Sequence, residues 1–190
     1  MAIWFTSDTH FKHANILKYC GRPFDNIGTH DQTLIKRWNN KVQPDDVVYH
    51  LGDFAFGRSE DWMTIIRQLN GCINLIKGNH DHSDKLKKLK ELPGKNLNFL
   101  GHYHEVKVDD EEMDVTQVIV LFHYPIESWN KRHHGSWHLH GHTHNNLMSP
   151  EYQARLDVSV DSHDYSPISY DDVKTLMTRK VFKVIDHHGS

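Results

Sequence analysis

Three short apolar segments near the N-terminus alternate with two segments of helical periodicity. Residues 2–6, 45–51 and 72–76 are expected to form strands, with helices at 29–42 and in a segment capped by Ser59. Apolar side chains recur on one face of each helix, at Leu34, Ile35 and Trp38 and at Trp62, Ile65, Ile66 and Leu69. This βαβαβ order constrains the fold most, because it predicts parallel strands joined by right-handed crossovers.

The rest of the chain is dominated by expected strands. They are placed at 99–108, 116–122, 137–144, 154–160 and 180–186. Ser169 and Asp172 form a capping-box signature at the start of a further helix. Strand-rich segments after a βαβαβ half predict an α/β fold of the α+β sandwich type, in which two stacked mixed β-sheets are flanked by helices.

The length of the chain fits one domain. A chain of 190 residues can bury a real core without disulfides or a structural metal. We expect a single domain at residues 1–186 and expect residues 187–190, with the sequence HHGS, to be a disordered tail or a cloning remnant. The net charge of −3 gives no electrostatic footprint for tight nucleic-acid binding.

The sequence is typical of a cytoplasmic protein. No apolar run approaches the roughly 20 residues that a membrane span needs, so no membrane partner is expected. The N-terminal sequence MAIWFTSDTH lacks the basic and apolar regions of a secretory signal. Cys20 and Cys72 are far apart and form no C-x-x-C pair, which fits a reducing compartment.

Polar motifs follow the expected strands directly. SDTH, GD and GNHD follow the first three strands, and HLHGHTH lies further along a chain in which 18 of 190 residues are histidine. Ligands of open parallel sheets bind at the carboxyl ends of the strands, so we expect these motifs to share one site. The candidate metal ligands are Asp8, His10, Asp53, Asn79, His123, His142 and His144.

Nitrogen and oxygen donors of this kind suit divalent first-row metals, namely Mn, Fe, Zn or Ni, and the lack of thiolates excludes a zinc ribbon. Alternate residues of an extended segment share a face, so Asp8 can converge with His10 and His142 with His144. Seven ligands with one bridging carboxylate serve two ions about 3.5–4 Å apart, and a metal-bridging hydroxide would then attack phosphorus in line.

Each motif alone also has a plainer interpretation. A D-x-H sequence arises by chance, GNHD is typical of a turn, and a histidine cluster can be a solvated surface feature. Gly52, Gly78 and Gly141 each precede a candidate ligand, where a glycine lets the backbone approach a crowded centre. The joint occurrence of the motifs, each after an expected strand, favours a metal site.

The series SDTH, GD, GNHD, FHYP and GHTH resembles the calcineurin-like metallophosphoesterases, specifically their small single-domain bacterial and phage members. These motifs span Asp8 to His144, about three quarters of the chain. The resemblance implies a two-sheet sandwich with a dinuclear metal centre. It also implies two divalent ions as cofactors, with Mn favoured and Fe, Zn or Ni as alternatives.

The resemblance assigns a role to each matching residue. Asp8, His10 and His144 would hold the first ion, and Asn79, His123 and His142 the second, with Asp53 between them. His80 would act as the general acid that protonates the leaving oxygen, because imidazole titrates near neutral pH. Asp81, which stands where many members have Glu, would orient or tune His80. The implied function is hydrolysis of phosphate esters, small phosphodiesters above all.

Three alternatives remain at this point. A phosphomonoesterase or a nuclease could use the same centre, with nucleic acid only as a substrate. A non-catalytic binding scaffold usually lacks a ligand or the acid, whereas all these positions match here. An amidohydrolase would usually open with H-x-H, whereas this chain opens with D-x-H. The expected partner is a small phosphate ester, and the oligomeric state stays open.

Three further residues are candidates for substrate binding. His13 lies one helical turn beyond His10, although a surface role fits it as well. Arg132 and His133 lie between two ligand segments and are expected to overhang the centre, where a guanidinium could bind phosphate. Asp161 follows an expected strand and could approach the site, without a firm role.

Overall fold

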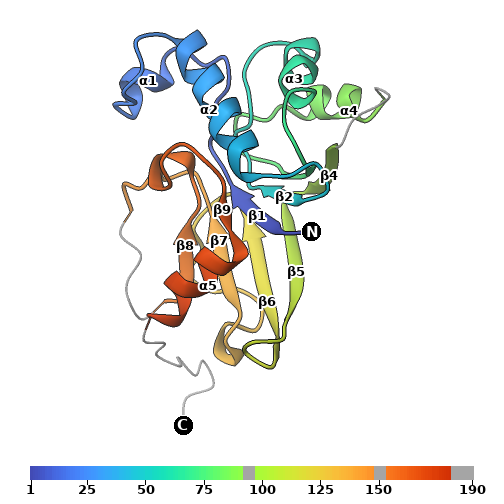
Figure 1. Ribbon diagram of the computed structural model, residues 1–190, viewed down its shortest axis with the longest axis vertical. Helices are drawn as coiled ribbons and strands as arrows, with labels where there is room; N and C mark the ends of the chain where they lie inside the picture. The colour runs from blue at the N-terminus through green and yellow to red at the C-terminus, as the bar shows by residue number, and fades with distance from the viewer. Residues whose placement is uncertain (92–96, 148–152, 181–190) are drawn as a thin grey trace.

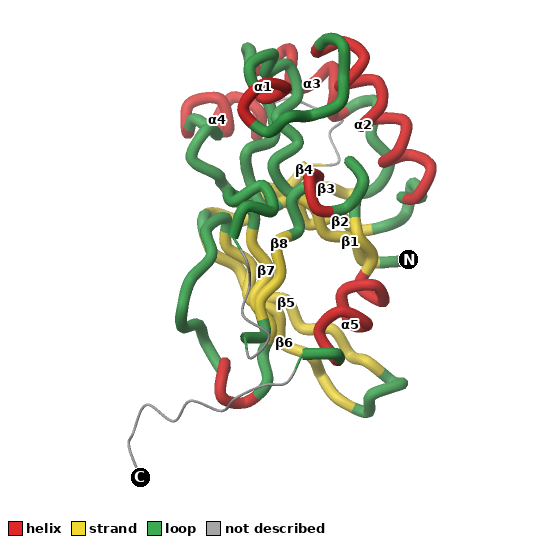
Figure 2. Tube along the Cα trace, turned by 90° about the vertical axis from the view of Figure 1, so that its left-hand side faces the viewer, coloured by secondary structure: helices red, strands yellow, loops and turns green. Residues whose placement is uncertain are grey.

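The computed structural model describes residues 1–91, 97–147 and 153–180 of the chain. Two β-sheets are stacked on one another, and helices cover the first sheet on the side away from the second (Figures 1 and 2). This arrangement confirms the predicted fold class, a sandwich of two mixed sheets flanked by helices.

The first sheet has the strand order β4-β3-β2-β1-β9. Neighbouring strands from β1 to β4 are parallel, as the βαβαβ pattern predicts, and β9 pairs antiparallel with β1. The strands are β1 (Ile3–Thr6), β2 (Val47–His50), β3 (Cys72–Ile76), β4 (Leu97–Gly101) and β9 (Ile168–Ser169). The helices that connect or precede them are α1 (Ile16–Tyr19), α2 (Ile27–Lys41), α3 (Ser59–Ile66) and α4 (Ser83–Glu91).

The second sheet has the order β5-β6-β7-β8. Its strands are β5 (Tyr103–Asp110), β6 (Val115–Phe122), β7 (Trp137–His140) and β8 (Arg155–Asp157), and helix α5 (Tyr170–Thr178) packs beside it. β5 and β6 are antiparallel, whereas β6, β7 and β8 run parallel. The prediction of one strand at 99–108 was wrong, because Gly101 takes a φ of 95° and the chain passes there from the first sheet to the second.

Alternating side chains of the first sheet build two cores. Trp4 packs against the core under α2, α3 and α4, whereas Phe5 enters the core between the two sheets. Leu75 and Ile76 divide in the same way. Period-two alternation with apolar residues on both faces is what a sheet covered on both sides requires.

Helix starts agree only partly with the predictions. Ser169 caps α5 and accepts a hydrogen bond from the Asp172 N–H at 3.1 Å, as predicted. Ser59 is the first residue of α3 rather than its cap, and Arg58 takes that position while its N–H donates to Asp61. Beyond Lys180, the expected closing strand and the 187–190 tail lie outside the described residues. None of the helices in the described ranges is long and apolar enough to cross a membrane.

Candidate metal centre

The seven predicted ligands lie together on loops at the carboxyl ends of five strands. Asp8 and His10 follow β1, Asp53 follows β2, and Asn79 follows β3. The remaining three, His123, His142 and His144, follow β6 and β7 of the second sheet. Each of the seven has a side-chain atom within 3.9 Å of another member. The centre therefore stands where the two sheets meet.

We call Asp8, His10 and His144 the first half of the centre. Imidazole nitrogens of the two histidines lie near one carboxylate oxygen of Asp8. Asp8 Oδ1 lies 3.9 Å from His10 Nε2 and 3.7 Å from His144 Nε2. Asp8 Oδ1 and His10 Nε2 are both buried, and neither has a hydrogen-bond partner. Leaving two such buried polar atoms unpaired is costly, so the geometry favours a bound cation between them.

We call Asn79, His123 and His142 the second half of the centre. Imidazole nitrogens of the two histidines lie near the amide oxygen of Asn79. Asn79 Oδ1 lies 2.9 Å from His123 Nε2 and 3.0 Å from His142 Nδ1. The other nitrogen of His123, Nδ1, donates to the Leu51 carbonyl at 2.8 Å. In a neutral ring, His123 Nε2 then carries a lone pair that faces the Asn79 oxygen, so a cation that contacts both atoms would satisfy them.

Asp53 stands between the two halves. Its Oδ2 lies 3.5 Å from His10 Nε2 and 3.5 Å from His123 Nε2. Its Oδ1 accepts a hydrogen bond from the His80 N–H at 2.8 Å, which fixes the carboxylate plane. A carboxylate oxygen equidistant from imidazoles of both halves is placed as a bridging ligand would be.

The separations fit metal coordination. Nitrogen and oxygen ligands about 2.0–2.2 Å from a metal ion lie about 3.0–3.4 Å apart in octahedral or tetrahedral geometry. The contacts within the centre run from 2.9 to 3.9 Å, close to this range. The described Asp and His side chains include two groups able to hold an ion, Asp8 with His10 and His144, and Asp8 with Asp53 and His123.

The backbone at the centre is bent rather than extended. Asp8, His10, His142 and His144 have φ values of 56°, 48°, 68° and 47°, and Asp53 has 57°. Our expectation that extended backbone aligns the paired ligands was therefore wrong, although the ligands do converge. Left-handed conformations are strained for residues other than glycine and concentrate at functional sites.

Two glycines give the ligand loops room. A Cβ added at Gly78 would overlap the Asp53 carboxylate, and one added at Gly141 would overlap Asp8 Oδ2 and Ser7 Oγ. The His142 N–H donates to Asp8 Oδ2 at 2.9 Å across this close approach. A side chain at Gly78 would separate the loops after β2 and β3, and one at Gly141 would separate the two sheets, so both glycines allow the close backbone approach that the sequence predicted.

Asp81 has a different role from the one expected. Its buried carboxylate accepts hydrogen bonds from three backbone N–H groups, those of Asp53 at 2.7 Å, Phe54 at 3.0 Å and Gly78 at 2.8 Å. Among the described contacts, none joins this carboxylate to the His80 ring. Asp81 therefore ties the β2 loop to the β3 loop instead of orienting His80.

Opposing effects set the pKa values of the ligands. Burial raises the pKa of Asp8 to about 6, despite the nearby imidazoles. Burial also disfavours the charge on Asp53, but its contacts with His123 outweigh that effect and hold the pKa of Asp53 below its ordinary value. Burial lowers the pKa of His10 to about 2. His123 shows the opposite balance, since Asp53 and Asp8 outweigh burial and raise its pKa to about 8. The carboxylates of Asp53 and Asp8 thus stabilise positive charge at His123.

His80 and His13 lie at the rim. The His80 side chain is exposed, and its ring centroid is 5.6 Å from that of His10. The His13 ring stacks on Phe56 at 3.8 Å and lies 6.2 Å from the His80 ring. Both residues therefore border the centre, as their positions in the sequence suggested.

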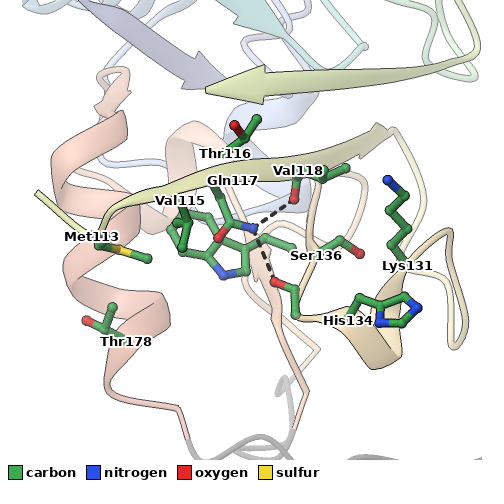
Figure 3. A pocket seen from close by; sticks show the side chains of 11 residues that line it. Met113, Val115, Thr116, Gln117, Val118, Lys131, His134, Ser136 and Thr178 are labelled. Carbon is green, nitrogen blue, oxygen red and sulfur yellow. Dashed lines mark hydrogen bonds between the residues drawn. The ribbon is translucent and has the colours of Figure 1, made fainter. Parts of the chain in front are cut away.

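Arg132 and His133 lie elsewhere, contrary to our expectation. They belong to a 3₁₀ helix (Arg132–His134) just before β7. After the end of β6 the chain runs back to the level of the first half of that strand before β7 begins, because the two strands are parallel. The Gly135 carbonyl next to this helix accepts from Gln117 near the start of β6. A cavity of about 290 Å³ lies there. Its lining includes Met113, Gln117, His134 and Thr178, whose side chains are drawn in Figure 3. Because β6 and β7 are parallel, this region is at the opposite end of the sheet from His123 and His142.

Sequence reasoning missed Arg22 and left Asp161 without a role. Arg22 is buried in the turn after α1, and its guanidinium makes an ion pair with Asp161 at 2.7 Å. Asp161 also accepts from His144 Nδ1 at 2.7 Å. No local motif marks Arg22, and only its three-dimensional contacts show its importance.

Comparisons with known proteins add relatives and a shared fold. No family model matches the chain. The uncharacterized protein MJ1445 of Methanocaldococcus jannaschii is 34% identical over 193 residues, which cover 97% of this chain and 96% of that protein. The Gene 66 protein of Mycobacterium phage D29 is 28% identical over 196 residues, covering 92% of this chain and 95% of that protein.

Two solved structures are similar to the chain. The protein of unknown function AQ665 from Aquifex aeolicus has a TM-score of 0.65 and 24% identity, and covers 92% of this chain and 98% of its own. This likeness supports the fold. An archaeal phosphodiesterase has a TM-score of 0.45 and 22% identity over 84% of this chain and 82% of its own, too loose a likeness to bear on function.

Proposed function

The chain belongs to the protein family of MJ1445 from Methanocaldococcus jannaschii, and we propose that it is a metal-dependent phosphoesterase. The observation that carries the proposal is the position of Asp53, whose Oδ2 lies 3.5 Å from an imidazole nitrogen in each half of the centre. The unpaired buried atoms of Asp8 and His10 support it, since a cation would satisfy both. The motif series that resembles the calcineurin-like metallophosphoesterases points to the same chemistry.

In this proposal the first half and the second half each hold one divalent cation, and Asp53 bridges them. Mn is the favoured ion, because mixed oxygen and imidazole ligands suit it, and Fe, Zn or Ni would also fit. When bound, two such ions would supply water activation at neutral pH and charge neutralisation at the phosphate. The protein residues fix the positions of the ions and exclude other ligands.

His80 protonates the leaving oxygen in this proposal. Its backbone N–H is held by Asp53, so the acid and the bridging carboxylate keep a fixed relation. The exposed ring stands beside the rings of His10 and His13, so it borders the centre on a side open to solvent. Loss of a positioned acid matters most for esters whose leaving groups are poor.

Aromatic side chains beside each half favour a small substrate. The stacked His13 and Phe56 rings border the first half, and the Tyr124 ring lies 4.7 Å from the His142 ring in the second half. Tyr124 is exposed, so its face is available to a planar or apolar substituent. We therefore favour small phosphodiesters with aryl or similar groups as substrates, and nucleic acid would take part only as a substrate.

A substrate panel tests the proposal. The chain would be stripped with chelator, reconstituted with Mn²⁺ and assayed on bis-aryl phosphate, aryl phosphate, cyclic nucleotides and single-stranded oligonucleotides, with Asp53→Asn as the matched control. We expect diester hydrolysis that chelator abolishes and Mn²⁺ restores, and that Asp53→Asn lacks. Faster turnover of aryl phosphate would indicate a phosphomonoesterase on the same centre. A Mn²⁺-loaded chain that hydrolyses none of the panel would contradict the proposal.

A further inference from the structure

We propose that Arg22, acting through Asp161, positions His144 and the Asp8 loop, and thereby sets the metal affinity of the first half without affecting the second. This inference rests on the proposed function in one respect, since it takes the centre to bind metal ions. It assigns to Arg22 and Asp161 a positioning role, because neither residue would touch the substrate.

One edge of the Arg22 guanidinium holds Asp161 in place. Nε donates to Asp161 Oδ1 at 2.8 Å, and Nη2 donates to Asp161 Oδ2 at 2.7 Å. The same Oδ2 accepts from His144 Nδ1 at 2.7 Å. When the His144 ring is neutral, its proton is thereby kept on Nδ1, so Nε2 carries the lone pair and faces Asp8 Oδ1 at 3.7 Å.

The other edge holds the strained loop after β1. Nη2 donates to the Asp8 carbonyl at 2.7 Å, and Nη1 donates to the Thr9 carbonyl at 3.1 Å. The backbone at Asp8 and His10 has φ values of 56° and 48°, which persist only when surrounding contacts enforce them. Arg22 supplies such contacts at Asp8 and at Thr9, which lies between the two strained residues.

The fifth donor of the guanidinium is also used. Nη1 lies 2.9 Å from His30 Nε2, which must accept, because the other ring nitrogen of His30 donates to Asp31 at 2.8 Å. All five N–H groups of Arg22 thus have partners in a fixed, planar arrangement. A lysine at this position keeps the charge but offers three donors at one point, so it cannot hold Asp161, the loop and His30 together.

The Arg22–Asp161 ion pair is explained by the positions in which it holds its neighbours rather than by its charge. The Arg22 side chain is fully buried and that of Asp161 is 8% exposed, and their charges cancel next to the first half. A buried ion pair often contributes little to stability compared with apolar residues, so stability alone does not account for it. In the second half, by contrast, His123 is supported by a backbone carbonyl, that of Leu51.

Arg37 provides a matched control. It forms a similar ion pair with Asp164 at 2.5 Å, and its carbon Cζ lies 5.9 Å from the Tyr165 ring. Unlike Arg22, it is 36% exposed, and its partner Asp164 is 84% exposed. Arg37→Lys and Asp164→Asn therefore change the same types of group without touching the centre.

The test is Mn²⁺ titration of the full chain by calorimetry, with variants combined in two backgrounds. His142→Ala disables the second half, so the remaining site reports the first half, and His144→Ala does the reverse. In the His142→Ala background we expect Arg22→Lys and Asp161→Asn to weaken Mn²⁺ binding by about 10–100-fold, the usual effect of losing an outer partner of a ligand. In the His144→Ala background the same changes should leave affinity within about twofold, because the hydrogen bonds of Arg22 and Asp161 go to none of the three second-half residues.

Each outcome decides the inference. Equal weakening in both backgrounds would indicate a general structural role and overturn it, as would unchanged affinity in the His142→Ala background. Arg37→Lys and Asp164→Asn should leave both sites unchanged. If Arg22→Lys does not fold, as judged by circular dichroism, Asp161→Asn carries the test, since it preserves side-chain size. Absence of Mn²⁺ binding in the unaltered chain would overturn the proposed function as well, whereas normal binding by the variants would overturn this inference alone.

Discussion

The two halves of the centre are built differently. In the first half, Asp8 and His10 are almost fully buried, and Arg22 and Asp161 hold the ligands from behind. In the second half, Asn79 and His142 are exposed. The first half is therefore the more shielded, whereas two of the three residues of the second half face solvent and only His123 is buried there. The difference suggests that one site is built for retention and the other for access.

Two histidines of one motif show the same contrast electrostatically. For His144, the hydrogen bond with Asp161 outweighs burial and raises the pKa to about 10. For His142, two residues earlier, burial and the nearby His123 lower the pKa. The Asp161 carboxylate beside the His144 ring thus makes the pKa values of His142 and His144 shift in opposite directions, even though both residues lie in one four-residue motif. Their behaviour toward metal and pH should differ accordingly.

The largest effect is expected for the residue that the halves share. Asp53→Asn removes the bridging charge but keeps the side-chain size, so both ions should be weakened together. We expect turnover to fall by more than the roughly 10²–10⁴-fold that loss of a general acid costs. Metal analysis and diesterase assays check this. Retention of two ions with ordinary turnover would mean that the halves do not share Asp53.

His80→Ala should separate chemistry from metal binding. We expect a loss of about 10²–10⁴ in turnover on substrates with poor leaving groups and a smaller loss on aryl esters, which need less protonation. Both ions should remain, because His80 is not among the ligands of either half. Equal losses on both kinds of ester would remove His80 from the role of acid.

Single-ligand variants should distinguish the halves directly. His144→Ala and His142→Ala are each expected to remove one ion, with an affinity loss at their own half exceeding the roughly 10–100-fold of an outer partner. The His142→Ala chain should keep the more tightly held ion. Titration with Mn²⁺ and metal analysis measure this, and the opposite ranking would contradict tighter binding at the shielded first half.

Acid should weaken metal binding. Protons on His123 and His144, whose pKa values are raised to about 8 and about 10, must leave before metal can bind. Since both groups are protonated below these values in the ion-free chain, affinity should rise with pH from 6 to 8, by about tenfold per unit for each proton displaced. Calorimetry in buffers of different ionisation enthalpy counts the protons released. A release of none at pH 7 would contradict these shifts.

The smallest effect is expected at the opposite end of the second sheet. Arg132→Ala and His133→Ala should change turnover by no more than about twofold, because surface changes remote from a site are usually near neutral. Steady-state kinetics with the diester checks this. A large rise in KM for either variant would restore their original role as phosphate-binding residues.

The sequence predicted those parts of the fold whose signals are local. The strand at Cys72–Ile76 was placed to the residue, because a continuous apolar run is bounded by polar motifs. The break at Gly101 was missed, since the passage between sheets depends on tertiary packing. Arg132 and His133 were misplaced because the parallel pairing of β6 with β7, which forces the chain back to the start of the sheet, is not visible in the sequence.

The candidate site shows the same limit. Its seven ligands were predicted from motif order, although the expected reason for their convergence, extended backbone, was wrong. Arg22 could not be predicted, because its partner Asp161 lies 139 positions away along the chain and neither residue belongs to a motif. Support of a ligand from behind depends on long-range contacts, so the sequence indicated the ligands but not what holds them.

Anomalous diffraction from Mn²⁺-loaded crystals tests the central claim most directly. We predict two peaks about 3.5–4 Å apart on either side of Asp53, one among Asp8, His10 and His144 and the other among Asn79, His123 and His142. Crystals grown at saturating Mn²⁺ that show no peak beside Asp53 would contradict the account.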